Sequence, residues 1–477
     1  MTKSFCKNFN AIILLYFAAH TVIRSCVGGN LERDEAEMII MAQGFHLGYG
    51  PQLPLYNWLQ AISFCLFGTN TFALTIVKNL LLATFYIALF DALKRLLPDR
   101  LALFGTLGAF LLPNMFWESQ RAGTHSIALF ATMAICLNIL SRLIVRPKKG
   151  HWAALGLAIA AGGLSKYNFW LFAGTLGLGA LSIRHLRSAI FRPQMVLSIA
   201  IASLLLAAPY FWSVTHPNLS LASSHKLHSP EAGPFAGLLA FSEQSFLALI
   251  FPVIVLGMAR VITRVPAHST QNSPFPAGQI VQWLLLTGLI GMAVSGSLAS
   301  ALNTQSFQAR WLLPSYIPIS IAMFIWALGK SGERAEAFIL LVTVAVASLT
   351  LTAMAANRLS GTTGNALDME RLAKAIEDSA PKTQAITMFG KTYFYTGNLA
   401  LIRPDWDAPS PGTAPLKAPH NFVLMETQND EDARTLLTSM GFPTPIDLTG
   451  IRYYTASIPY RSSAKPPRLV PFALLER

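Results

Sequence analysis

Long apolar runs separated by short polar segments fill the chain up to residue 356. About 20 apolar residues let a helix cross the hydrocarbon core of a membrane, and tilted or partly buried helices can be shorter or longer. Runs of this kind predict about eleven membrane-spanning helices, near residues 9–23, 70–93, 101–116, 123–143, 151–163, 167–184, 194–213, 236–260, 280–300, 311–328 and 336–356. The pattern is typical of an α-helical polytopic membrane protein.

The pattern changes after residue 356, where polar residues become frequent. Two stretches of this segment are helix-like, at residues 367–379 and 430–440. Three short runs are β-like, at 385–389, 393–395 and 422–425, and a proline-rich loop covers 403–419. Proline-rich segments of this kind favour loops. The sequence therefore predicts two domains, a transmembrane domain over residues 1–356 and a small soluble α/β domain over residues 357–477.

Basic residues in alternate loops predict the orientation, because lysine and arginine are enriched in cytoplasmic loops. One set of loops holds sixteen basic residues: Lys3, Lys7, Lys94, Arg95, Arg100, Arg142, Arg146, Lys148, Lys149, Arg184, Arg187, Arg192, Arg260, Arg264, Lys330 and Arg334. The other set holds six: Arg24, Arg33, Arg121, Lys166, Lys226 and Arg310. We therefore expect a cytoplasmic N-terminus with an uncleaved first helix. An odd number of spans then places residues 357–477 in the periplasm.

The composition agrees with a membrane protein, since 53% of the 477 residues are hydrophobic, only 12% are charged, and the mean hydropathy is +0.46. Soluble domains carry about 25% charged residues. The net charge of +13 is explained by the basic loops, so no nucleic-acid partner is predicted. The four cysteines form no CxxC pair, and there is no P-loop, glycine-rich dinucleotide motif or HExxH sequence. Neither a metal site nor a cofactor is therefore predicted.

Carboxylates gather in the loops that are predicted to lie outside the cytoplasm. Asp34 and Glu35 follow the first span, and Glu118 lies in the second outer loop. Each has an ordinary explanation, because acidic residues favour helix N-termini and Glu118 could pair with Arg121 on one helix face. Such a cluster is nevertheless unusual in a chain with so few charged residues.

Three basic residues belong to the same predicted surface. Arg121 follows Glu118, Lys166 lies between two short spans, and Arg310 precedes a span. A lysine at the membrane is costly and is by default a functional candidate, whereas Arg310 could also be an interface anchor beside Trp311. Fixed cations suit the binding of a lipid phosphate, and a positioned carboxylate can remove a proton from a hydroxyl. The combination predicts a site for both tasks.

Several sequence patterns resemble the GT-C glycosyltransferases that use polyprenyl-phosphate sugars, the superfamily of protein mannosyltransferases and aminoarabinose transferases. The strongest likeness lies in the first outer loop, at residues 33–36, 54–56 and 58–59. Two later segments also match, at residues 163–166 and 310–314. Residues 117–121 and 124–126 are most similar to the bacterial branch with rhizobial lipopolysaccharide galacturonosyltransferases. The likeness in organisation covers residues 9–356.

This resemblance implies transfer of a sugar from an undecaprenyl-type phosphate carrier to an acceptor at the periplasmic face of the inner membrane. Asp34 would be the catalytic base in an inverting displacement, Glu35 would orient the loop or bind the acceptor, and Glu118 would be a second acid. Three cations would neutralise the leaving phosphate: Arg121, Lys166 and Arg310. The expected acceptor is lipid A, lipopolysaccharide core or another envelope glycan.

Two positions depart from relatives. Gln52 stands where aminoarabinose transferases have a charged Glu-Lys pair, and His125 stands where many relatives have an aspartate. Gln52, Tyr56 and His125 are expected to contact substrate. The long loop over residues 215–235 contains His225 and His228, but a polar lid is favoured over a metal site.

Two other classes of function remain as alternatives, a polytopic transporter and a lipid-carrier flippase. A transporter predicts internal repeats and charged residues at the membrane midplane. No repeat is evident, and the charged residues gather at one predicted surface. A flippase would not need an aspartate at position 34.

Overall fold

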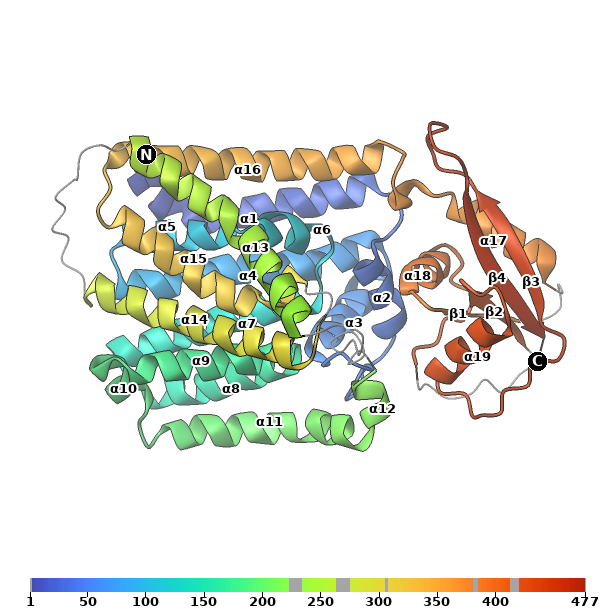
Figure 1. Cartoon of the computed structure of the whole chain (residues 1–477), viewed down its shortest axis with the longest axis horizontal. Coiled ribbons are helices and arrows are strands. Elements are labelled where there is room, and N and C mark those ends of the chain that lie inside the picture. The colour runs from blue at the N-terminus through green and yellow to red at the C-terminus, as the bar shows by residue number, and fades with distance from the viewer. Residues whose placement is uncertain are drawn as a thin grey trace.

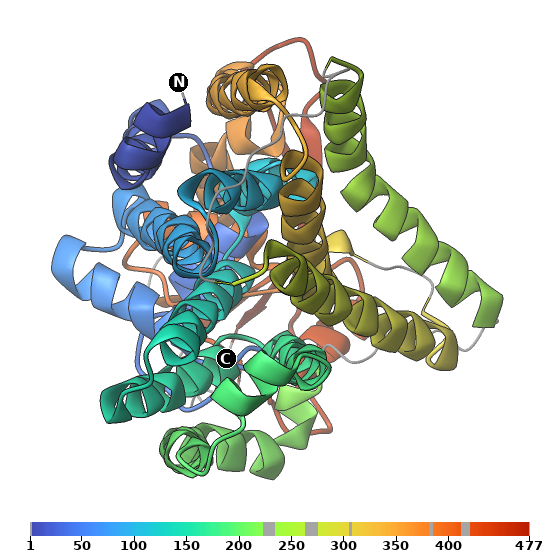
Figure 2. The ribbon, with the colours of Figure 1, turned by 90° about the vertical axis from the view of Figure 1, so that its left-hand side faces the viewer.

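The computed structural model describes residues 2–222, 234–262, 275–304, 308–380, 385–411 and 420–476. Long helices form one elongated bundle, and a smaller region of strands and helices is attached to one end of it (Figure 1). The N-terminus lies at the opposite end of the bundle. Figure 2 views the bundle from that end, with many long helices nearly end-on and α13 and α14 inclined to them.

Each predicted span coincides with a helix. Within the described residues these eleven helices are α1 (Thr2–Val27), α4 (Thr71–Leu96), α5 (Asp99–Phe110), α7 (His125–Val145), α8 (Lys149–Ser165), α9 (Asn168–Leu181), α11 (Met195–Thr215), α13 (Pro234–Ile262), α14 (Ala277–Ala301), α15 (Leu313–Leu328) and α16 (Glu333–Leu359). In the described part of the chain, seven helices are long and apolar enough to cross a membrane, or eight if one bent pair forms a single span. The polytopic character is thus confirmed, and the count of eleven spans stays a prediction.

Close packing in the bundle depends on small residues where helices cross. On α5, Gly108 lies against α15, and a Cβ atom at this position would approach the ring of Phe324 to 2.8 Å. Gly105, one turn earlier, faces Ile325 in the same way. Small residues let helix backbones approach closely in membranes, where hydrophobicity alone does not drive association. α5 is accordingly buried at the centre of the bundle.

Short helices occupy the end of the bundle that faces the C-terminal region. They are α2 (Arg33–Met41), α3 (Leu55–Phe67), η1 (Asn114–Glu118), α6 (Ser119–Ala122), α12 (Pro217–Ser220) and η3 (Ala309–Trp311). The segment between α1 and α4 thus contains two helices, α2 and α3, which the apolar pattern did not predict. α10 (Arg184–Ile190) lies at the other end (Figure 1). The predicted lid residues His225, Lys226 and His228 lie outside the described residues.

The C-terminal region contains, among the described residues, one four-stranded sheet of order β1-β2-β4-β3. Its elements are η4 (Gly364–Ala366), α17 (Met369–Ser379), β1 (Ala385–Gly390), α18 (Tyr393–Ile402), β2 (His420–Met425), α19 (Asp430–Ser439), β3 (Arg452–Ile458) and β4 (Arg468–Glu476). β1 and β2 are parallel, and β4 is antiparallel to both β2 and β3. Side chains alternate across the sheet: Met388 packs in the core with α17 and α18, and Phe389 packs in the core with α19.

One prediction for this region was wrong. Residues 393–395 form the start of α18 and not a strand. Parallel neighbouring strands need a crossover connection, and a helix between β1 and β2 supplies it. Tyr395 and Leu399, one helical turn apart, are buried against the sheet. The helical and β-like runs at 367–379, 385–389, 422–425 and 430–440 match α17, β1, β2 and α19.

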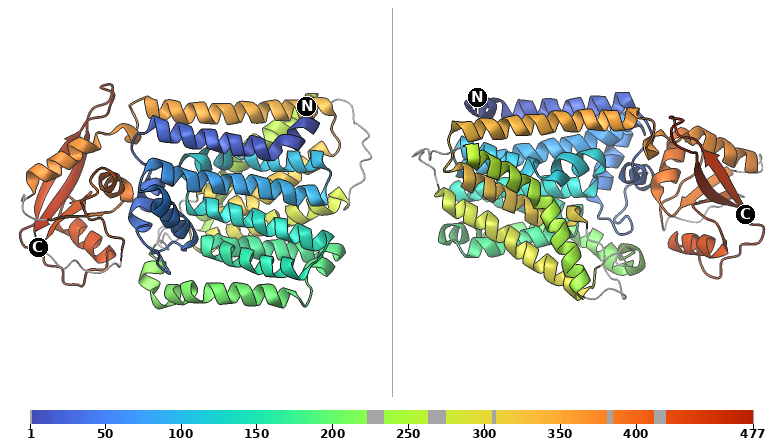
Figure 3. Two further views of the ribbon diagram at one scale, coloured as in Figure 1. Left: turned by 180° about the vertical axis from the view of Figure 1, so that it is seen from behind. Right: turned by 45° about the horizontal axis from the view of Figure 1, so that its top comes forward.

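The C-terminal region joins the bundle through α18, which packs directly on α2 (Figure 3). Gly397 lies so close to α2 that a Cβ atom would approach the carbonyl oxygen of Ala36 to 2.3 Å. Next to it, the side chain of Asn398 accepts a hydrogen bond from the backbone N–H of Leu31 (2.7 Å) and donates one to its carbonyl (3.3 Å). α2 is therefore fixed from the C-terminal side. The domain division at residue 357 stays a prediction.

Candidate active site

Asp34 lies in the first turn of α2, which begins with a capping box. The backbone N–H of Glu32 donates to the side chain of Glu35 (3.0 Å), so the start of the helix is held at a fixed place. The Asp34 side chain is about one quarter exposed and accepts a hydrogen bond from Arg310 Nη1 at 3.1 Å. Burial raises the pKa of Asp34 above its ordinary value, although Arg310 partly counteracts this.

Glu35 lies in a buried cluster of charges beneath α2. Its carboxylate is surrounded by three cations, with distances of 2.8 Å to Arg24, 3.6 Å to Arg358 and 3.8 Å to Lys78, and all four side chains are nearly inaccessible. Burial alone would raise the pKa of Glu35, but Arg24 and the other cations outweigh it and hold the pKa below its ordinary value. Glu35 is thus a fixed carboxylate that anchors α2 and does not line either cavity described below.

Arg310 and Lys166 are brought to the same place by a contact between two turns. The side-chain amide of Asn168, at the start of α9, donates to the carbonyl of Trp311 in η3 (2.8 Å). Lys166 lies in the break between α8 and α9 and donates to the hydroxyl of Ser126 (2.8 Å). Burial, and then the nearby charge of Arg310, lower the pKa of Lys166 to about 8. Two predicted phosphate ligands therefore lie on either side of a common space.

Glu118 and Arg121 are positioned by a sharp bend of the chain. α5 ends before Pro113, and the helical segment Asn114–Ala122 continues at an angle of 75° to it. Arg121 contacts two carboxylates, Glu32 at 3.1 Å and Glu118 at 3.4 Å. Arg121 is thus already paired with two carboxylates, and its role as a phosphate ligand stays a prediction.

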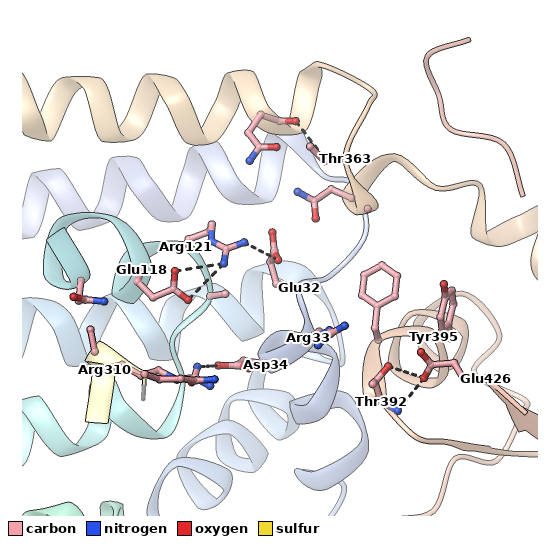
Figure 4. Close-up of a pocket in the computed structure, with 18 of the residues that line it drawn as sticks. Glu32, Arg33, Asp34, Glu118, Arg121, Arg310, Thr363, Thr392, Tyr395 and Glu426 are labelled. Atoms are coloured by element: carbon pink, nitrogen blue, oxygen red, sulfur yellow. Dashed lines mark hydrogen bonds and ion pairs between the residues drawn. The ribbon is translucent and has the colours of Figure 1, made fainter. Parts of the chain in front are cut away.

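Two cavities meet at Asp34. The first, called the interface cavity, has a volume of about 670 Å³ and lies between the bundle and the C-terminal region (Figure 4). The second, called the lysine cavity, has a volume of about 660 Å³ and is lined by Lys166 and, from the C-terminal region, by residues such as Lys391 and Tyr393. Both cavities are lined by Arg33, Asp34, Glu118, Gln308, Arg310 and Thr392. Asp34 can thus contact molecules bound on either side.

The remaining predicted residues fall near the lysine cavity. Gln52 and His125 line it. His125 Nε2 lies 3.0 Å from the side-chain oxygen of Asn57. Tyr56 is fully buried, and its ring packs on the ring of His125 with centroids 5.5 Å apart. Gln52 and His125 can contact a ligand in this cavity, whereas Tyr56 acts on the site only through the packing of His125.

Several residues of the site were missed by the sequence analysis. Lys78 binds Glu35 from within an apolar span and Arg358 binds it from the last turn of α16, and a lysine inside a span was a signal that could have revealed the cluster. Phe394 and Arg468 line the interface cavity from the C-terminal region. Nothing local in the sequence marks these two residues, because only folding brings them to Asp34. In the described part of the chain no group of three His, Cys, Asp or Glu residues could hold a metal ion.

Comparison with known proteins identifies relatives of this chain. Residues 50–212 match the family of dolichyl-phosphate-mannose-protein mannosyltransferases. The lipopolysaccharide core galacturonosyltransferase RgtB of Rhizobium johnstonii is 30% identical over 348 residues, which are 70% of this chain and 68% of RgtB. RgtA of the same organism is 29% identical over 324 residues, or 66% of this chain and 63% of RgtA.

Solved structures show the same fold. The crystal structure of ArnT from Cupriavidus metallidurans bound to undecaprenyl phosphate superimposes with a TM-score of 0.61, covering 99% of this chain and 98% of ArnT. The two sequences are 14% identical, so this likeness concerns the fold. Both kinds of comparison agree with the resemblance found in the sequence. The chain therefore belongs to the family of the rhizobial lipopolysaccharide core galacturonosyltransferases, and it is a membrane-spanning glycosyltransferase of the GT-C fold.

Proposed function

We propose that the protein transfers a sugar from a polyprenyl phosphate of the undecaprenyl type to a hydroxyl group of an envelope glycan. The acceptor is lipid A, lipopolysaccharide core or another glycan at the periplasmic face of the bacterial inner membrane. The observation that carries this proposal is the position of Asp34 on the wall shared by two cavities, one of which contains Lys166 and Arg310. The relatives support the substrate classes, because RgtB is named for galacturonosyl transfer to lipopolysaccharide core and ArnT binds undecaprenyl phosphate.

The donor phosphate is assigned to the lysine cavity. Lys166 there donates to the neutral hydroxyl of Ser126, and among the residues that the structure describes no ion pair engages it, so its ammonium group can bind a phosphate oxygen. Arg310 is shared between Asp34 and this space. Arginine and lysine beside a phosphate stabilise the negative charge that develops on it as the glycosidic bond breaks, most strongly where water is excluded.

The acceptor is assigned to the interface cavity on the opposite side of Asp34. A single displacement needs the attacking hydroxyl and the leaving phosphate on opposite sides of the anomeric carbon. With the donor in the lysine cavity, the interface cavity supplies the other side. Arg121 then belongs to the acceptor side, where its bonds to Glu32 and Glu118 hold the wall of the cavity.

In the proposed reaction Asp34 acts as a general base. Its carboxylate takes the proton of the acceptor hydroxyl while that oxygen forms a bond to the anomeric carbon. The bond from this carbon to the phosphate oxygen breaks, and the electron pair stays on the polyprenyl phosphate. The raised pKa of Asp34 makes its carboxylate a better proton acceptor than an exposed aspartate. The product has the inverted anomeric configuration.

The experiment that tests this function is transfer from a panel of synthetic polyprenyl-phosphate sugars by the purified full-length protein in detergent. Each donor is incubated with lipopolysaccharide, and the transferred sugar and its anomeric configuration are determined by mass spectrometry and NMR. Transfer with inversion from one donor class supports the proposal and names the sugar. Retention of configuration, or the absence of transfer from every donor by a correctly folded protein, contradicts it.

A further inference from the structure

The C-terminal region supplies one wall of the interface cavity, directly opposite α2 (Figure 4). The residues that it contributes include Thr392, Phe394, Tyr395, Glu426 and Arg468. They face Arg33 and Asp34 across a space of about 670 Å³, within the range of about 300–1,000 Å³ that is usual for ligand pockets. A ligand in this cavity that reaches Asp34 therefore also contacts the C-terminal region.

An aromatic ring and a guanidinium group are held in place on this wall. Phe394 is half-buried and packs edge-to-face on Tyr395, with ring centroids 5.2 Å apart. Tyr395 is itself buried, and the guanidinium group of Arg468 lies 5.6 Å from its ring centroid. Tyr395 thus fixes the positions of both neighbours. An ordered aromatic ring in a polar cavity suits the apolar C–H face of a sugar ring.

The charges of the cavity differ in how far they are already paired. Arg121 contacts two carboxylates and Arg310 contacts Asp34. The carboxylate of Glu426 accepts hydrogen bonds from the N–H (3.0 Å) and the hydroxyl (2.7 Å) of Thr392. In the part of the chain that the structure describes, no ion pair engages the exposed guanidinium groups of Arg33 and Arg468. Arg468 contacts the neutral side chain of Tyr395, so both guanidinium groups still carry charge that can bind a negatively charged substituent.

We propose that the interface cavity is a subsite for an anionic glycan, in which Phe394 packs on a sugar ring and Arg468 and Arg33 bind a phosphate or carboxylate substituent. This inference rests on the proposed function and deepens it, because it makes the C-terminal region the part that selects the acceptor. Two guanidinium groups on opposite walls clamp the substituent, and the ring sets the depth at which the acceptor hydroxyl meets Asp34. A neutral glycan makes only the aromatic contact.

The test compares acceptor kinetics of the full-length wild type, Arg468→Gln and Phe394→Leu. The acceptors are a lipopolysaccharide core oligosaccharide and the same material with its phosphates removed and its carboxylates reduced. A hydrogen bond to a charged group contributes about 1.5–3 kcal/mol, so Arg468→Gln is expected to raise KM for the anionic acceptor about 10- to 100-fold. The KM for the neutral acceptor and for the donor should not change. Phe394→Leu should raise KM for both acceptors.

Arg452→Gln is the matched control, since Arg452 lies on the adjacent strand β3, is 62% exposed and pairs with Glu476. Arg468→Lys should restore part of the lost affinity because it keeps the charge. The inference is overturned if Arg468→Gln has the wild-type KM for the anionic acceptor, if Arg452→Gln raises this KM equally, or if the wild type uses both acceptors alike. Failure of the wild type to release sugar from any donor would instead contradict the proposed function.

Discussion

Replacement of Glu35 by glutamine tests whether the buried charge cluster holds the catalytic helix. The substitution keeps the size of the side chain and removes its negative charge. Arg24, Arg358 and Lys78, all within 3.8 Å of the carboxylate, then remain as positive charges without their central partner. The amide also donates where the backbone N–H of Glu32 needs an acceptor, so one orientation of the amide loses the capping box.

The expected loss in the free energy of unfolding follows from how deeply Glu35 is buried. Removal of one partner from a buried ion pair costs about 3–5 kcal/mol, whereas an exposed pair contributes about 0–1 kcal/mol. The Glu35 side chain is 5% exposed. Glu370, which pairs with Arg403 at 2.8 Å and is 64% exposed, is a matched control for the same substitution. We therefore expect Glu35→Gln to lower the free energy of unfolding by about 3–5 kcal/mol and Glu370→Gln by at most about 1 kcal/mol.

Denaturant unfolding in mixed micelles, followed by tryptophan fluorescence, measures both variants, and sugar transfer is assayed on the folded fraction. Adding Arg24→Gln to Glu35→Gln should cost less than the sum of the single changes, because the two residues share one cluster. Equal stability and equal activity of Glu35→Gln and the wild type would refute the reasoning. Because the pKa of Glu35 is depressed in the folded state, its contribution is fully present above about pH 4.3 and is lost only as the pH falls below that value.

Two further predictions concern the site and its support. The kcat/KM of transfer should rise with pH as Asp34 loses its proton, at a pH above the ordinary pKa of an aspartate, and should fall near pH 8 as Lys166 loses its charge. The Lys166→Arg variant should lack the fall at alkaline pH. A pH profile of this variant identical to that of the wild type would contradict the assignment. Gly397→Ala should force α18 away from Ala36 and destabilise the docking of the C-terminal region by about 1–3 kcal/mol, which limited proteolysis and kcat will report. Gly278→Ala, where a Cβ meets no atom within 4 Å, is the control, and unchanged protease resistance of Gly397→Ala would show that the contact is not tight.

Much of the transmembrane architecture could be predicted because apolar periodicity is local. Each of the predicted spans coincides with a helix, since a run of apolar residues in lipid must satisfy its backbone hydrogen bonds internally. The helices at 33–41 and 55–67 were missed, because one is too short and the other is interrupted by polar residues such as Asn57 and Gln60. Both of these polar side chains are buried against neighbouring helices, which sequence periodicity does not reveal.

The candidate site was predictable where charge is costly and unpredictable where the fold creates the contact. The high cost of a charge at the membrane singled out Lys166 and Arg310 as candidate site residues, and in the structure both line one cavity. The sequence indicated that Arg121 could pair with Glu118, three residues earlier, but not that it also pairs with Glu32, which comes from a different loop. The wall of the interface cavity was likewise hidden, because it depends on how far the C-terminal region folds back over α2.

The same distinction applies to the C-terminal sheet. The strands β1 and β2 were predicted as short β-like runs, whereas β3 and β4 were not. β4 lies between β2 and β3, so its pairing joins segments that are distant in the chain. The aromatic run at 393–395 favours a strand locally, but the crossover between parallel strands requires a helix there. Pairing between distant segments thus determines both the strands β3 and β4 and the helix at 393–395, which the local sequence did not predict.

The most direct test of the central claim is sugar transfer by Asp34→Asn. A general base contributes about 10²- to 10⁴-fold to the rate, so kcat should fall by this factor while the donor still binds. Asp99→Asn, at a half-exposed carboxylate that pairs with Lys94, is the matched control and should keep wild-type activity. Wild-type kcat in Asp34→Asn would contradict the account and leave Glu118 as the carboxylate to examine at the junction of the two cavities.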